Sequence, residues 1–151
     1  MYKIYLAGPI KGRNIIDVVS DWREKEELFG SMGYKVLSPL TGMHKHPLYD
    51  NSVTGGGYNG TTTNNHAIFS RDKCMVQRCD IIFADLVYAD QVSIGTVMEL
   101  AWANLLGKHI VISMPKNSIH EHAFVLECTN IIFNNTQDAI DYFKDLISNA
   151  R

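Results

Sequence analysis

Residues 80–113 have the sequence DIIFADLVYADQVSIGTVMELAWANLLGKHIVIS. Within it, Asp80–Ala84 and His109–Ser113 are short apolar runs of the kind that form buried strands. Between them, Ser93–Leu106 has a small polar start and an apolar interior, with Gly107 just past its end, which is typical of a helix. A strand, a helix and a second strand in this order predict two parallel strands joined by a helical crossover.

The same alternation continues on both sides of this unit. Further strands are predicted at Tyr2–Ala7, Tyr34–Leu37 and Asn130–Phe133, and further helices at Asp17–Met32, Ala67–Arg78, His120–Glu127 and Thr136–Ser148. This pattern predicts an α/β fold with a doubly wound, five-stranded parallel sheet, Rossmann-like or flavodoxin-like, and helices on both faces. Ligands bind such sheets outside the carboxyl ends of the strands, expected here at residues 8–13, 38–42, 85–93 and 113–117.

A single domain is expected over residues 1–151, because a chain of 151 residues suits one domain. Residues 40–65 form its longest expected loop, rich in Gly, Thr, Asn and His, with three consecutive glycines starting at Gly55. A loop of this length is unusual in a compact domain and is interpreted as either a mobile lid or a locally disordered segment.

Composition narrows the class of protein. A net charge of −2 and the lack of a basic tract argue against a nucleic-acid partner. Three cysteines without a CxxC pair favour a reduced, cytoplasmic protein over a secreted one. The chain opens on a strand-like run instead of a signal sequence, and no apolar stretch reaches the ~20 residues that span a bilayer, so no membrane association is expected.

Glu99 is the only formally charged residue between Asp90 and Lys108. A lone carboxylate in an apolar segment is exposed to desolvation, which raises its pKa and suits it to nucleophilic or acid–base work. The competing interpretation places Glu99 on the exposed stripe of a half-buried helix.

Ser93, Gly95 and Thr96 lie at the expected start of the same helix. Two hydroxyls and a glycine suit an anion such as phosphate, because a helix N-terminus attracts negative charge and glycine lets the anion approach the backbone N–H groups. The alternative is that Ser93 and Thr96 only cap the helix.

Two further segments allow two interpretations each. Residues 8–13, Gly-Pro-Ile-Lys-Gly-Arg, lack the GxGxxG spacing of a dinucleotide site and form either an anion cradle or a plain turn with solvated charges. Asp72 follows Ser70 and Arg71 at an expected helix start. It is either a first-turn acid favoured by the helix dipole or an acid/base group.

The histidines do not predict a metal site. His44 and His46 are two residues apart, as are His120 and His122, and neither pair has the spacing of ligands on one helix face. The sequence therefore predicts neither a metal nor a cofactor.

Four segments occur in an order and spacing that resemble the nucleoside 2-deoxyribosyltransferase superfamily. They are Tyr5-Leu6-Ala7-Gly8-Pro9, Arg71-Asp72, the run from Cys79-Asp80 to Leu86, and Ser93-x-Gly-Thr-x-x-Glu99-Leu-x-x-Ala103. The resemblance covers about residues 2–113 and extends more loosely to the C-terminal part.

The resemblance implies one of two activities. Transferases of the superfamily move deoxyribose between free nucleobases, whereas N-hydrolases cleave nucleoside 5′-monophosphates such as deoxynucleoside monophosphates, CMP or hydroxymethyl-CMP. In both, the glutamate that Glu99 matches attacks C1′ of the sugar. Tyr5 matches the tyrosine that orients this carboxylate, and Asp72 matches the aspartate near the leaving base.

The residue six positions before the glutamate distinguishes the two types. Transferases tend to carry an aspartate there, which holds the free 5′-hydroxyl, and the hydrolases carry a serine, which binds the 5′-phosphate. This chain has Ser93. A carboxylate would repel a phosphate dianion, whereas a hydroxyl and backbone N–H groups bind it. With the hydrolase-like first loop, the predicted phosphate ligands are Ser93, Gly95, Thr96, Arg13 and Gly12.

The resemblance also implies a homodimer or higher homo-oligomer in which the neighbouring subunit completes each site. The segment that would reach the neighbour is His120–Val125. Contacts with the sugar or base are assigned to Gly8, Ile10, His44 and His122.

The predicted function is hydrolysis of the N-glycosidic bond of a (deoxy)ribonucleoside 5′-monophosphate through a covalent adduct on Glu99. Its expected partner is a small-molecule nucleotide. One alternative is a transferase that exchanges bases on free nucleosides. A second is a nucleotide-binding sensor without turnover.

Overall fold

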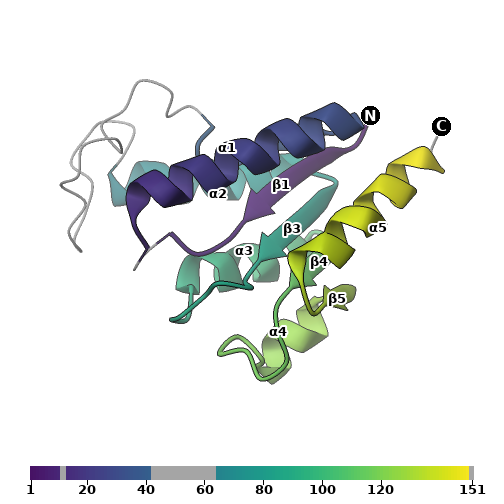
Figure 1. Cartoon of the computed structure of the whole chain (residues 1–151). Helices are drawn as coiled ribbons and strands as arrows, with labels where there is room; N and C mark the ends of the chain where they lie inside the picture. Colours follow the sequence, from purple (N-terminus) through teal and green to yellow (C-terminus); the bar gives the residue numbers. More distant parts are fainter. Residues whose placement is uncertain (11–12, 42–63, 150–151) are drawn as a thin grey trace.

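A computed structural model of the chain describes residues 1–10, 13–41 and 64–149. In these ranges five parallel strands form one sheet in the order β2-β1-β3-β4-β5 (Figure 1). The strands are β1 (Lys3–Ala7), β2 (Lys35–Leu37), β3 (Ile81–Asp85), β4 (His109–Ser113) and β5 (Ile131–Phe133). The helices are α1 (Ile15–Met32), α2 (Asn65–Arg78), α3 (Ile94–Leu105), α4 (Ala123–Cys128) and α5 (Thr136–Ser148).

Helices cover both faces of the sheet, as predicted. In Figure 1, α1 and α5 lie on the near side of the sheet and α2 and α3 on the far side. Because side chains alternate along a strand, Ile4 and Leu6 of β1 pack with α1 and α5. Tyr5 and Ala7 point to the other face and pack with α2, α3 and α4. The predicted doubly wound, five-stranded α/β fold is confirmed.

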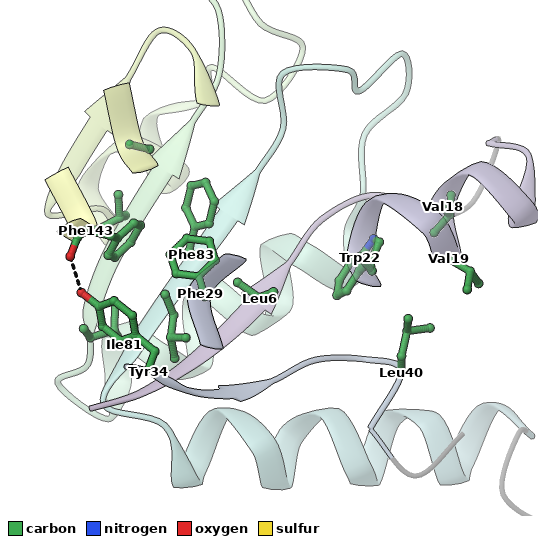
Figure 2. Packing of buried hydrophobic residues seen from close by; sticks show 13 residues of the cluster. Leu6, Val18, Val19, Trp22, Phe29, Tyr34, Leu40, Ile81, Phe83 and Phe143 are labelled. Atoms are coloured by element: carbon green, nitrogen blue, oxygen red, sulfur yellow. Dashed lines mark hydrogen bonds between the residues drawn. The ribbon is translucent and has the colours of Figure 1, made fainter. Parts of the chain in front are cut away.

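An aromatic cluster fixes α1 and α5 against the sheet (Figure 2). Phe29 of α1, Phe83 of β3 and Phe143 of α5 are almost fully buried, and the ring centroids of Phe29 and Phe143 are 5.2 Å apart in an edge-to-face contact. Tyr34 donates its hydroxyl to the Phe143 carbonyl at 2.7 Å, so its one polar group is satisfied. Burial of each phenyl ring contributes about 1.5–3 kcal/mol to stability.

Several predicted boundaries shift by a few residues. The helix predicted from Ala67 begins at Asn65, because Asn64 caps it by accepting the Ala67 N–H. The helix predicted over His120–Glu127 is shorter and begins after His122, whose side chain accepts the Phe124 N–H. Gly33 ends α1 in the left-handed conformation expected of a helix-terminating glycine. Most of the predicted loop of residues 40–65 lies outside the described residues.

The strand order places a switch point between β1 and β3, where ligands bind in sheets of this topology. The two strands approach closely at this edge, because a Cβ on Gly8 would lie 3.0 Å from the Asp85 carbonyl oxygen. Asp85 itself ties the edge together: it accepts the hydroxyls of Ser113 and Thr136 and pairs with Lys25 of α1 at 2.8 Å. Among the described residues, none of the helices is both long enough and apolar enough to cross a membrane.

Candidate active site

Glu99 lies on the buried face of α3. The helix turns Thr96, Glu99, Leu100 and Ala103 toward the sheet, at the i, i+3, i+4 and i+7 positions of one helical face. Glu99 is only 7% exposed, so the interpretation that placed it on an exposed stripe is wrong.

Tyr5 is the partner of Glu99. It projects from the middle of β1 onto the same side of the sheet, and its hydroxyl donates to Glu99 Oε1 at 2.7 Å. Tyr5 is fully buried. The Glu99 carboxyl group, although removed from water, therefore retains one strong hydrogen bond from a residue of β1.

Asp72 reaches this cluster from α2. It lies in the middle of the helix and is buried, so the interpretation of a first-turn acid is wrong: α2 begins at Asn65, two turns earlier. The Arg71 Nε lies 3.5 Å from Asp72 Oδ1. That oxygen is buried, and the Arg71 guanidinium is its charged neighbour.

The two carboxyl groups differ in their acidity. Burial raises the pKa of Glu99 to about 8, although the hydrogen bond from Tyr5 opposes the rise and the charge of Asp72 adds to it. Burial raises the pKa of Asp72 less, to about 6, because the Arg71 guanidinium opposes it. The pKa of Tyr5 lies well above its ordinary value, chiefly through burial, so Tyr5 stays a hydrogen-bond donor at neutral pH.

Ser93 and Thr96 form a pair of hydroxyls at the N-terminus of α3. Ser93 is the N-cap residue, yet its side chain makes no capping bond to the helix backbone. Its Oγ lies instead 2.9 Å from Thr96 Oγ1. The interpretation of Ser93 as a plain side-chain cap is therefore wrong, and the first N–H groups of α3 keep their capacity to bind an anion.

Gly95 leaves the approach to these groups open. It is exposed, and a Cβ built on it would meet no atom within 4 Å. This arrangement agrees with the predicted phosphate site without testing it.

His120 holds the backbone at the same place. Its Nε2 accepts the N–H of Ser93 at 2.8 Å, and the residue is 1% exposed. The sequence predicts His120 at the start of a helix and in the segment that reaches the neighbouring subunit, and predicts no contact with Ser93. No local pattern reveals the contact, because its two residues are 27 positions apart.

The remaining predicted residues lie elsewhere. Arg13 pairs with Asp21 of α1 at 3.2 Å, on the α1 side of the sheet. A small cavity there is lined by Gly8 and Arg13 together with Lys25 and Asp85. Ile10 packs on the core of that same side. His122 is exposed at the start of α4. The structure thus brings together Tyr5, Asp72 and Glu99, and separately Ser93 and Thr96.

Gly12 and His44 lie outside the described residues, so their predicted roles stay predictions. No group of three or more His, Cys, Asp or Glu side chains suited to a metal ion occurs within the described ranges.

The model of the nucleoside 2-deoxyribosyltransferase family matches residues 4–142. The chain belongs to this family. The predicted resemblance is therefore confirmed, and the match extends beyond the segments that suggested it.

A solved structure has the same fold as this family member. It is the CMP N-glycosidase BcmB of Clostridium botulinum, with 16% sequence identity and a TM-score of 0.57, over 95% of this chain and 98% of that chain. A comparison with curated protein sequences gives no significant match.

Proposed function

We propose that this member of the family is an N-glycosidase that hydrolyses nucleoside 5′-monophosphates to a free base and (deoxy)ribose 5-phosphate. The observation that carries the proposal is the position of the Ser93–Thr96 hydroxyl pair, at the open N-terminus of the helix that also bears Glu99. A phosphate held there places the sugar of the same molecule near the carboxyl group. The activity named for the similar glycosidase, which acts on CMP, supports the choice of a monophosphate.

The first half of the proposed reaction forms a glycosyl ester. The Glu99 carboxylate attacks C1′ as the N-glycosidic bond breaks, and the electron pair of that bond stays on the base nitrogen. The Asp72 carboxyl group supplies the proton that the leaving base takes up. Tyr5 holds the attacking carboxylate in place through its 2.7 Å hydrogen bond.

The second half releases the sugar. Water attacks C1′ of the ester and gives its proton to the Asp72 carboxylate, while the C1′–oxygen bond breaks and returns Glu99 to its ionised form. The first half starts from an ionised Glu99 and a protonated Asp72, and the second half restores both. This is the less populated state of the free enzyme, because the pKa of Glu99, about 8, exceeds that of Asp72, about 6.

Base release from a panel of ribo- and deoxyribonucleoside 5′-monophosphates, with the matching nucleosides as controls, tests the proposal. We expect release from a monophosphate and loss of at least about a thousandfold in kcat for Glu99→Ala. Retained activity in Glu99→Ala contradicts the mechanism. Faster reaction of free nucleosides with an added base shows a transferase instead, and binding without base release shows a sensor.

The outer surface suggests how the chain assembles. Ile94, Met98 and Leu105 form an exposed apolar stripe along α3, and Phe124 of the adjacent α4 is 78% exposed. Exposed apolar patches of this kind mark interaction surfaces. We propose that a second copy of the chain covers this stripe and that the segment around His122 is presented to the neighbouring site.

Light scattering coupled to size-exclusion chromatography tests this assembly. We expect a dimer or a larger oligomer for the wild type and a monomer for Leu105→Glu. Assembly would bury the introduced charge in the interface between the copies, which is costly. Ile16→Glu, on exposed α1 surface, is the matched control and keeps the wild-type mass. A monomeric wild type contradicts the proposal.

The described cysteines Cys74, Cys79 and Cys128 are free thiols, which supports the cytoplasm as the proposed compartment.

A further inference from the structure

His120 is a buried imidazole that the proposed reaction does not use. Its Nε2 accepts the Ser93 N–H at 2.8 Å, so the ring is neutral and its proton lies on Nδ1. No described residue accepts a hydrogen bond from Nδ1, although the atom is buried. A buried donor without an acceptor lowers stability, so an apolar side chain of similar size would suit a purely structural position better.

A tight turn after β4 holds the imidazole in place. Asn117 adopts a left-handed conformation with φ of 61°, and its N–H donates to Glu121 Oε2 at 2.7 Å. The Ser118 carbonyl accepts the Glu121 N–H at 2.9 Å, and the Ser118 hydroxyl accepts the His120 N–H at 3.2 Å. These bonds on both sides of His120 fix its backbone before any ligand binds.

The hydrogen bond from Ser93 to His120 acts on the N-cap residue of α3. The Ser93 N–H lies outside the helix, and the side chain of Ser93 does not cap it, so the bond to His120 is what fixes this N-cap from the N-terminal side. Burial lowers the pKa of His120, which keeps Nε2 an acceptor at neutral pH. A protonated ring would direct a second N–H at the Ser93 N–H and lose the bond.

We propose that His120 is a positioning residue for the substrate phosphate: by holding the Ser93 N–H, it sets the N-terminus of α3 so that the Ser93 and Thr96 hydroxyls meet the 5′-phosphate. The inference rests on the proposed function. It predicts that His120, in the turn between β4 and α4, affects the binding of phosphorylated ligands and not that of nucleosides.

Three proteins test the proposal: the wild type, His120→Leu, which lacks an acceptor, and His120→Gln, whose amide oxygen replaces Nε2. In His120→Leu we expect the KM for a nucleoside 5′-monophosphate to rise about tenfold with kcat within about twofold, since one hydrogen bond to the phosphate-binding segment is lost. His120→Gln restores the wild-type KM. The kcat/KM for the matching nucleoside is equal in all three.

A purely structural role predicts a different result, in which kcat and KM change together for nucleotide and nucleoside alike. That outcome overturns the proposal. So does a wild-type KM in His120→Leu, or a KM in His120→Gln that is raised as much as in His120→Leu. If His120→Leu does not fold, His120→Asn takes its place, because its shorter amide does not reach the Ser93 N–H.

Calorimetric titration with ribose 5-phosphate separates this proposal from the proposed function. If the wild type releases no base from any nucleotide, the proposed function fails, and the affinities of the three proteins for ribose 5-phosphate still decide the role of His120. The expected order is wild type and His120→Gln about tenfold tighter than His120→Leu. No binding of ribose 5-phosphate or 2-deoxyribose 5-phosphate by the wild type overturns the role proposed for His120, whereas the proposed function is decided by base release.

Discussion

The hydroxyl of Tyr5 and the carboxyl group of Glu99 are joined by a 2.7 Å hydrogen bond across 94 positions of the chain. Tyr5 comes from the interior strand β1 and Glu99 from the inner face of α3, and both are buried. This bond opposes the rise in the pKa of Glu99 that burial causes. The Tyr5–Glu99 pair therefore links the packing of the core to the ionisation of the proposed nucleophile.

Tyr5→Phe removes the donor and leaves the ring. We expect kcat for base release to fall about 10–100-fold, because the Glu99 carboxylate loses its orienting bond and its pKa rises above about 8. The plateau of the pH profile falls, and its alkaline limb, which begins at the pKa of Glu99, moves to higher pH. Steady-state kinetics across pH measure both effects. Unchanged kinetics with an unchanged profile contradict the role of Tyr5.

Glu99→Gln raises stability at alkaline pH. The pKa of Glu99 rises from 4.5 to about 8 on folding, so between these values the folded chain holds a proton that the unfolded chain has released. Stability therefore falls as the pH rises through this window. We expect Glu99→Gln to abolish this fall and to raise Tm at pH 8 by several degrees.

Scanning calorimetry from pH 5 to about 8.5 checks this prediction. Glu27→Gln, an exposed position on α1, is the control and leaves the pH dependence as in the wild type. A Glu99→Gln variant with the wild-type slope would show that Glu99 ionises normally in the folded chain.

The two carboxyl groups predict a bell-shaped dependence of kcat/KM on pH. Activity falls below about pH 6, where the ionised fraction of Glu99 shrinks tenfold per pH unit. It also falls above about pH 8, where Asp72 has lost its proton in almost all molecules. In Asp72→Asn the alkaline limb disappears and the acid limb follows Glu99 alone. Its pKa is then below about 8, because the charge of Asp72 no longer raises it. An alkaline limb that persists in Asp72→Asn assigns the proton donor to another group.

Ser93→Asp tests the choice between nucleotide and nucleoside. A carboxylate beside the phosphate site repels a dianion, so kcat/KM for the monophosphate is expected to fall at least about a hundredfold, with little loss for the nucleoside. Ser93→Asn is the matched control of similar size without charge. Both residues are good N-caps, which keeps α3 intact. Equal effects of the two substitutions on the monophosphate would rule out a phosphate next to Ser93.

The fold was largely predictable because its signals are local. Apolar runs such as His109–Ser113 and capping residues such as Gly33 depend on their immediate neighbours, and both were predicted at the correct positions. The order of strands in the sheet was not predicted, since it follows from packing between distant segments. The start of α2 was misplaced because the cap at Asn64 lies inside a polar run that predicts a loop equally well.

The site was predicted in part. Glu99 stood out as a lone charge in an apolar helix, and family resemblance supplied Tyr5 and Asp72, whose own segments are ordinary. The bond from Ser93 to His120 was not predictable, because it joins two loops that only the folded sheet brings together. For Arg13 the charge pattern suggested an anion cradle or a solvated charge, whereas its guanidinium pairs with Asp21, two turns along α1.

Tyr5 lies on β1, an interior strand of the sheet, and Glu99 lies on the helix packed against it, so the reactive carboxyl group belongs to the hydrophobic interior. Residues 87–93 and 115–119, in the loops after β3 and β4, are exposed or half-buried. Exchange of those segments between family members therefore offers a route to altered base preference that leaves Tyr5 and Glu99 in place. A library of variants confined to these segments can change substrate choice and keep the reacting residues.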